Sequence, residues 1–209
     1  GTQRLPVADF AAELERHGTN LGTGAGRRAL SVSLDLPLSR LEGGLALLTD
    51  ALATPAFPEV SIERLKKQRV DAIALEAASA ATLADRMADT VFFTEEDRYS
   101  RPVGGTIATV GSVSRDLAAD FYAAHASPAN ATIVLVGDFA SIDVAAILER
   151  TLGTWAATAR STPPIERARL ARIPVIRVID RPDSVQTELR LVGRGFDRAA
   201  AEWTTSNLA

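Results

Sequence analysis

The stretch S-P-A-N-A-T-I-V-L-V-G-D-F, residues 127–139, decides the fold class of this 209-residue chain. Its centre is an uncharged and mostly β-branched run, residues 133–136. A proline and an asparagine precede the run, and Gly137-Asp138 ends it. A short run of this kind between turn-forming residues is typical of a buried strand. A helical pattern follows over residues 141–153, so we predict a strand that leads into a helix.

Outside this stretch, helical patterns alternate with one further strand pattern. Residues 30–36 alternate apolar and polar side chains, which predicts a half-buried strand. The glycine-rich residues 20–26 precede that strand and not a helix, so they predict a hairpin and not a phosphate-binding loop. Helices are predicted over residues 5–17, 39–54, 59–80, 82–93, 115–126 and 141–153, with Ser39 and Ser114 as N-caps and a corner at Phe57-Pro58.

These elements predict an α+β fold, with an antiparallel or mixed sheet and helices packed on one of its faces. Residues 1–155 form the first domain in this interpretation. A stretch rich in Ala, Arg, Thr and Pro predicts a linker over residues 156–173. Two strand patterns, 175–179 and 185–192, follow it. We therefore expect residues 174–209 to hold the opening strands of a second domain.

Composition excludes several classes of function. The net charge of −3, without a basic stripe, gives no reason to expect nucleic acid as a partner. No apolar run reaches the roughly 18 residues that a membrane span needs. The absence of cysteine excludes disulfides, thiolate nucleophiles and Cys-ligated zinc, and it leaves the compartment open between bacterial periplasm and cytoplasm. The chain begins at Gly1 without Met, and we expect this end to be cut or processed.

The residues by themselves contain no catalytic constellation. The two histidines, His17 and His125, lie far apart in the sequence, each near the end of a predicted helix. A zinc site formed by two histidines four residues apart on one helical face is therefore excluded for this sequence. A serine nucleophile would need a histidine base and a G-x-S-x-G turn, and the chain has no such motif.

Several segments, in order, resemble the pitrilysin/insulinase family of zinc metallopeptidases, which includes the mitochondrial processing peptidases. These segments are Gly1-Thr2, the helix and corner R-L-E-G-G-L-A-L-L-T-D-A-L-A-T-P-A-F at 40–57, Y-S-R-P with G-G-T at 99–106, D-L and F-Y at 116–122, P-A-N-A-T-I-V-L-V-G-D-F at 128–139, and D-R-P with V-Q-T at 180–187. Together they extend over most of residues 1–196. The resemblance implies a processing-peptidase-like fold, with an incomplete first peptidase-like domain and a second repeat that opens at residue 174.

The resemblance also implies where the zinc ligands of the family would lie. The H-x-x-E-H motif of the family lies on a helix just before its G-T, and this chain starts after that point. The third ligand is a Glu in a V-x-E-I-like step, which matches Val70, Asp71, Ala72 and Ile73, so Ala72 occupies the ligand position. Glu76, one turn later, is the candidate metal ligand if the register shifts, and otherwise a surface carboxylate. We assign no catalytic, cofactor-binding or metal residue in this segment.

The given sequence lacks the H-x-x-E-H motif and has Ala72 at the position of the third ligand. These two differences from the family pattern predict a non-catalytic domain or subunit of a zinc metallopeptidase. It would help to form the peptide-binding chamber, while an active partner half holds the zinc and cleaves the substrate. The expected partners are a peptide or unfolded polypeptide and an active peptidase domain or subunit, in a dimer. Two alternatives stay open: a segment of an active metalloendopeptidase whose H-x-x-E-H helix lies upstream of Gly1, and a structural assembly subunit like the respiratory core proteins. Whether the chain is part of an enzyme is therefore undecided at this point.

Overall fold

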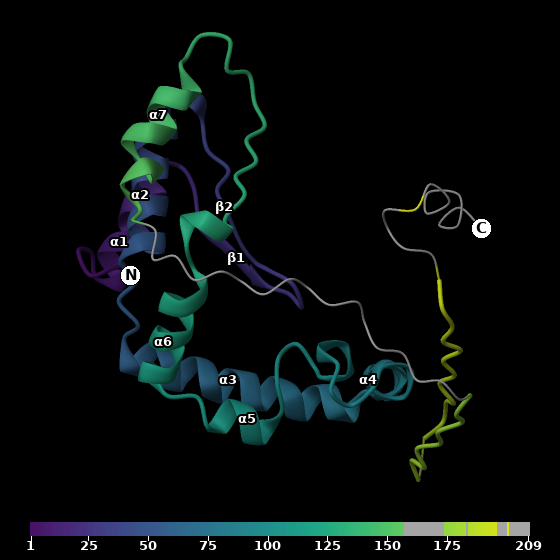
Figure 1. Cartoon of the computed structure of the whole chain (residues 1–209). Coiled ribbons are helices and arrows are strands. Elements are labelled where there is room, and N and C mark those ends of the chain that lie inside the picture. Colours follow the sequence, from purple (N-terminus) through teal and green to yellow (C-terminus); the bar gives the residue numbers. More distant parts are fainter. Residues whose placement is uncertain (157–173, 183, 196–199, 201–209) are drawn as a thin grey trace. The chain divides into compact units, whose positions relative to one another are not determined.

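A computed structural model of the chain describes residues 1–156, 174–182, 184–195 and 200 (Figure 1). The chain divides into two compact units. The first unit comprises Gly1–Val70 and Thr106–Ile165, and the second comprises Asp71–Gly105 and Glu166–Ala209. The predicted linker lies almost wholly outside the described residues, so the predicted domain boundaries stay predictions. Among the described helices, none combines the length and the apolar character that crossing a bilayer requires.

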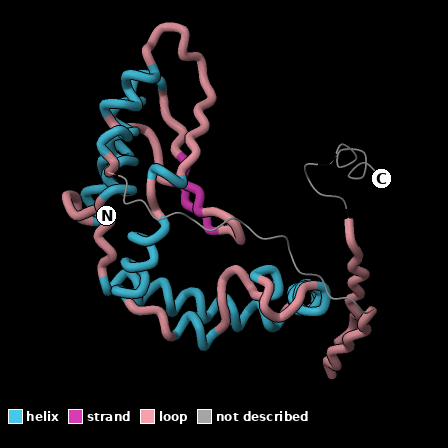
Figure 2. Tube along the Cα trace, viewed as in Figure 1, coloured by secondary structure: helices cyan, strands magenta, loops and turns pink. Residues whose placement is uncertain are grey.

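Helices dominate the described residues, and the strands are limited to one hairpin (Figure 2). The helices are α1 (Val7–Arg16), α2 (Leu41–Ala53), α3 (Glu59–Ala78), α4 (Ala80–Phe92), α5 (Ile107–Gly111), α6 (Arg115–His125) and α7 (Val144–Arg150), and the strands are β1 (Gly22–Ala25) and β2 (Leu30–Ser33). Short 3-10 turns lie at Leu38–Arg40, Arg98–Ser100, Pro128–Asn130 and Leu152–Thr154. The six helices predicted from periodicity are therefore confirmed in type and order, and α5 was not predicted.

Capping residues explain where some helices begin. Ser114 caps α6 as predicted, because its hydroxyl accepts a hydrogen bond from the Leu117 amide at 3.1 Å. The prediction of Ser39 as the cap of α2 is wrong. A 3-10 turn, closed by the Arg40 amide on the Pro37 carbonyl at 2.8 Å, contains Ser39, and α2 begins one turn later at Leu41. A residue inside a turn cannot take the extended backbone of an N-cap.

The core of the first unit consists of two apolar clusters on either side of α2. The first joins α1 to α2 through Phe10, Leu14 and Leu47. The second joins α2 to the turn after α7 through Leu41, Leu45 and Leu152, with Leu36 and Leu135 among the half-buried residues packed against it. Helix α2 is therefore the central element of the unit, since it contributes buried leucines to both clusters.

The predicted hairpin is confirmed, but the burial predicted for its second strand is wrong. Strands β1 and β2 pair antiparallel, with Gly22 opposite Ser33 and Ala25 opposite Leu30. The side chain of Leu30 is 55% exposed, because no further layer covers this two-stranded hairpin among the described residues. Leu34 and Leu36, which continue the same alternation beyond the strand, are the residues that pack against the clusters.

The strand predicted over residues 133–136 does not form in the structure. Val134 and Val136 are 80% and 93% exposed, and only Leu135 of this run packs against the second cluster. A strand needs a neighbour that pairs with its amides and carbonyls, and no described segment lies in register beside this one. The strand patterns at 175–179 and 185–192 have the same outcome: their residues belong to neither helix nor strand (Figure 2).

Candidate functional site

Helix α3 carries the position at which the resemblance places the third zinc ligand. The helix follows the corner at Phe57, whose backbone has a positive φ of 46°, and it begins with Glu59, whose carboxylate is favourable at the positive end of the helix dipole. Ile73 is the buried residue of the helix, at 6% exposure. Ala72, its neighbour, is half-buried and presents only a methyl group. The helix therefore offers no ligand atom at this position.

Glu76, the alternative ligand, lies one turn further along α3 and forms an ion pair with Arg86 of α4. Their side chains are 32% and 29% exposed, respectively, so the pair is partly shielded from water. A guanidinium on a carboxylate occupies the oxygen that a metal ion would need. Zinc binding by Glu76 would therefore require Arg86 to be displaced.

The histidines lie at helix ends in separate surroundings. His17 follows the last residue of α1, and its ring packs so closely on α2 that a Cβ at Gly43 would lie 2.2 Å from its Cε1 atom. His125 ends α6 and its ring centroid is 4.5 Å from that of Phe121. No three His, Asp or Glu side chains in the described part of the chain converge on a point where a metal ion could be held. A catalytic zinc site requires three protein ligands, and the described residues do not bring three together.

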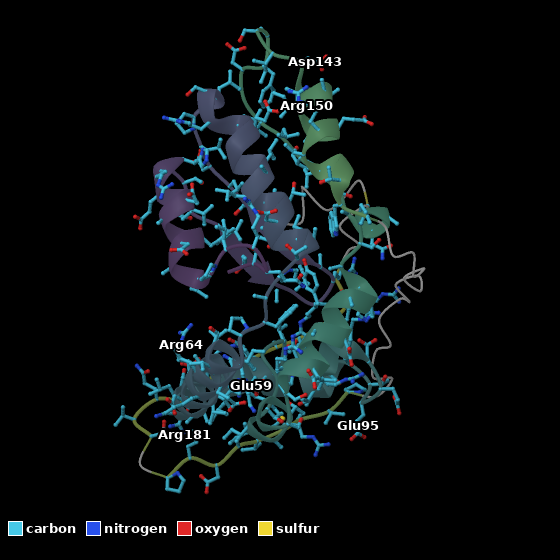
Figure 3. The ribbon with its side chains drawn as sticks, turned by 90° about the vertical axis from the view of Figure 1, so that its left-hand side faces the viewer. Glu59, Arg64, Glu95, Asp143, Arg150 and Arg181 are labelled. Atoms are coloured by element: carbon cyan, nitrogen blue, oxygen red, sulfur yellow. The ribbon has the colours of Figure 1, made fainter. Side chains whose placement is uncertain are left out.

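An exposed ion pair joins α2 to α7 in the first unit. Arg150 donates from Nε to one oxygen of Glu42 at 3.0 Å and from Nη2 to the other at 3.3 Å (Figure 3 labels Arg150). This hydrogen bonding, followed by the charge of Arg150, lowers the pKa of Glu42 from its ordinary range. The charge of Asp143, the N-cap of α7, also acts on Arg150, so this exposed group of charges links α2 to the start and end of α7.

Tyr122 of α6 links that helix to the α2–α3 corner. Its hydroxyl donates to the Leu52 carbonyl at 2.8 Å, and its ring makes an edge contact with Phe57 at 5.5 Å between centroids. Burial raises the pKa of Tyr122 above its ordinary value of 10.0. The sequence reasoning missed this contact, although Tyr122 belongs to the F-Y pair on which the resemblance partly rests.

Replacing Tyr122 by phenylalanine should lower the free energy of unfolding by about 1 kcal/mol, because the Leu52 carbonyl at the end of α2 loses its donor. The wild-type chain should also lose stability as the pH rises above 10.0 through the raised folded pKa, since only the neutral phenol is favoured in the folded state. Urea titrations at pH 8 and pH 10.5 would measure both effects. If the free energy of unfolding falls between pH 8 and pH 10.5 more in the wild type than in Tyr122→Phe, the assignment is supported. If it falls equally in both proteins, the assignment is contradicted.

Comparisons with known proteins find similar sequences and structures. Residues 112–205 match the family model of the peptidase M16 inactive domain. The structure resembles that of a peptidase M16 inactive domain from Pseudomonas fluorescens, with a TM-score of 0.71 and 23% identity over 80% of this chain and 41% of that one. None of the curated proteins matches the chain significantly.

Two further solved structures share the fold. A protease from Helicobacter pylori has a TM-score of 0.70 and 13% identity, over 82% of this chain and 41% of that one. Pitrilysin has a TM-score of 0.62 and 19% identity, over 82% of this chain and 19% of that one. The chain thus spans less than half the length of the proteins that it resembles. The predicted α+β, processing-peptidase-like fold class is confirmed by these likenesses.

The family-model match covers the motifs at 116–122, 128–139 and 180–187, and the shared fold extends over most of the chain. The resemblance to the pitrilysin/insulinase-type metallopeptidases is therefore confirmed: residues 112–205 match the inactive-domain model of the M16 peptidases, and the chain has the fold of solved M16 peptidase structures.

Proposed function

We propose that this chain is a non-catalytic part of a zinc metallopeptidase and helps to form the chamber in which an active partner half cleaves peptides. The observation that carries the proposal is Ala72 on α3, at the position where the resemblance expects a carboxylate ligand. The nearest carboxylate along the helix, that of Glu76, is engaged by Arg86. A catalytic zinc site needs three protein ligands and one open position, and no group of three such donors occurs among the residues that the structure describes.

In this proposal the chain contributes to proteolysis through binding. A surface that holds a peptide near a catalytic centre lowers the barrier by positioning, although it supplies no acid, base or metal ligand. The partner is an active peptidase domain or subunit that holds the zinc, and the two halves form a dimer around a peptide or an unfolded polypeptide. The inactive-domain match of residues 112–205 supports this division of labour.

The zinc content of the natural full-length protein tests the proposal most directly. The protein would be purified alone and then together with its active partner, and both preparations would be examined by elemental analysis and by cleavage of an unfolded polypeptide. We expect zinc and cleavage only in the pair. About one zinc per chain in the lone protein, with cleavage, would support an active peptidase whose H-x-x-E-H helix lies upstream. Co-purification with cytochromes and no peptide binding would instead support a structural subunit.

The variant Glu76→Gln separates a metal-ligand role from an ion-pair role. We expect it to leave the zinc content and the cleavage rate of the pair unchanged, and to lower the free energy of unfolding by only about 0.5–1 kcal/mol through loss of the Arg86 pair. The matched control is Glu63→Gln, which removes the pair of Glu63 with Lys66 on the same helix. Loss of zinc in Glu76→Gln but not in Glu63→Gln would assign Glu76 as the ligand and refute the proposal.

A further inference from the structure

Helices α3 and α4 are separated only by Ser79, and we call this interruption the break. Two arginines of the second unit, Arg181 and Arg190, donate hydrogen bonds on its two sides. The guanidinium of Arg181 donates from Nη2 to the carbonyl of Ala78, the last residue of α3, at 3.0 Å (Figure 3 labels Arg181). The guanidinium of Arg190 donates from Nη2 to the carbonyl of Ala81, in the first turn of α4, at 3.5 Å. Both arginines therefore bind backbone on either side of Ser79, the residue that separates the two helices.

Arg190 is also held by two carboxylates. Its Nε donates to Asp85 of α4 at 2.5 Å, and its Nη1 donates to Glu188 of its own segment at 2.9 Å. The Arg190 side chain is 32% exposed, whereas Leu189 and Leu191 beside it are 84% and 99% exposed. Alternate residues of an extended segment point to opposite sides. The polar side of this segment thus faces α4, and its position there is set by charged hydrogen bonds and not by apolar packing.

The break itself explains why cations bind here. The last carbonyls of a helix have no partner within the helix and carry partial negative charge, so a guanidinium near them is favourable. Ser79 begins α4 by accepting a hydrogen bond from the Thr82 amide at 3.3 Å. This bond satisfies one amide of α4 but leaves the carbonyls that end α3 to other donors, and Arg181 supplies one of them.

We propose that Arg181 and Arg190 form an ionic clamp that fixes the break between α3 and α4. Arg181 holds the end of α3, and Arg190 holds the first turns of α4 through Ala81 and Asp85. While both are bound, the two helices keep one angle at Ser79. When the clamp releases, the break opens and the adjoining turns exchange their amide protons faster. The proposal rests on these contacts and does not depend on the proposed function.

Hydrogen exchange of the full chain, followed by mass spectrometry, tests the clamp. In Arg190→Ala we expect the peptide that spans residues 80–86 to exchange about three- to tenfold faster, the effect of losing hydrogen bonds to a charged group at a partly exposed site. Arg177→Ala, in the same segment, is the matched control and should leave these amides unchanged. At 1 M salt, where the Debye length is about 3 Å, the exchange rate of residues 80–86 in the wild type should rise towards the rate in Arg190→Ala.

A second variant protects the test against general unfolding. Asp85→Asn alters the α4 side and leaves both arginines in place, and it should reproduce the faster exchange over residues 80–86. Amides of α1 and α2 in the first unit serve as the internal reference and should not change. Equal exchange in Arg190→Ala and Arg177→Ala, or no effect of Asp85→Asn, would overturn the clamp.

Discussion

Replacing Leu45 by alanine should lower the free energy of unfolding of the first unit by about 3 kcal/mol, within the range of 2–5 kcal/mol seen when a buried leucine is truncated. Leu45 is 5% exposed and forms, with Leu41 and Leu152, the cluster that joins α2 to the turn after α7. The loss combines the transfer free energy of the removed methyl groups with the cost of the cavity that remains. Helices on both sides of α2 limit how far the site can collapse.

Urea denaturation followed by tryptophan fluorescence would measure this effect. The chain has two tryptophans, so a Trp203→Phe background makes Trp155, which follows Leu152 in the same turn, the single reporter. The control is Leu65→Ala on α3, where the side chain is 54% exposed and the expected change is below about 0.5 kcal/mol. If Leu45→Ala and Leu65→Ala shift the midpoint equally, the second cluster is not the core of this unit.

Replacing Gly43 by alanine should destabilise the first unit by about 1–2 kcal/mol, although alanine is the better helix former by about 1 kcal/mol. The new Cβ would lie 2.2 Å from Cε1 of His17 and 2.9 Å from each ring nitrogen. The imidazole must therefore move, and its Nδ1 atom is buried without a hydrogen-bond partner in the described structure. Displacement of the ring disturbs the packing of α1 on α2, which outweighs the gain in helix propensity.

A double-mutant cycle isolates this contact. In a His17→Ala background the steric conflict is absent, so Gly43→Ala should become stabilising by about 0.5–1 kcal/mol through helix propensity alone. The reversal of sign between the two backgrounds is the expected result, read from urea midpoints at pH 8. Destabilisation of the same size in both backgrounds would show that Gly43 is required by α2 itself and not by the imidazole.

A search for zinc ligands would first examine the two histidines and Glu76. Each of these side chains contacts a neighbouring side chain or helix. His17 packs between two helices, His125 contacts an aromatic ring, and Glu76 is paired with Arg86. None of these three side chains joins the other two in the described structure. The decisive experiments remain those on the pair of subunits, because zinc and cleavage are expected only there.

Local sequence patterns predicted the helices well because each helix satisfies its own backbone. The period of apolar residues, the cap at Ser114 and the corner at Phe57 are properties of adjacent residues, and the structure confirms them. The motifs in their order also predicted the family. The strand predicted at 133–136 was wrong because a strand cannot satisfy its own backbone. It needs a second strand to pair with, and the apolar run at 133–136 contains no information about that second strand.

The sequence by itself therefore determined the helices and the hairpin, and its motifs predicted the family resemblance. Only the tertiary structure decided which charges meet: Glu42 with Arg150, 108 positions apart, and Asp85 with Arg190, 105 positions apart. Side chains so distant in sequence carry no periodicity that links them. Their contacts depend on how buried leucines orient the helices in one unit and on where an extended segment lies in the other. Apolar patterning specifies the elements, and the path of the chain in space brings these polar partners within hydrogen-bonding distance.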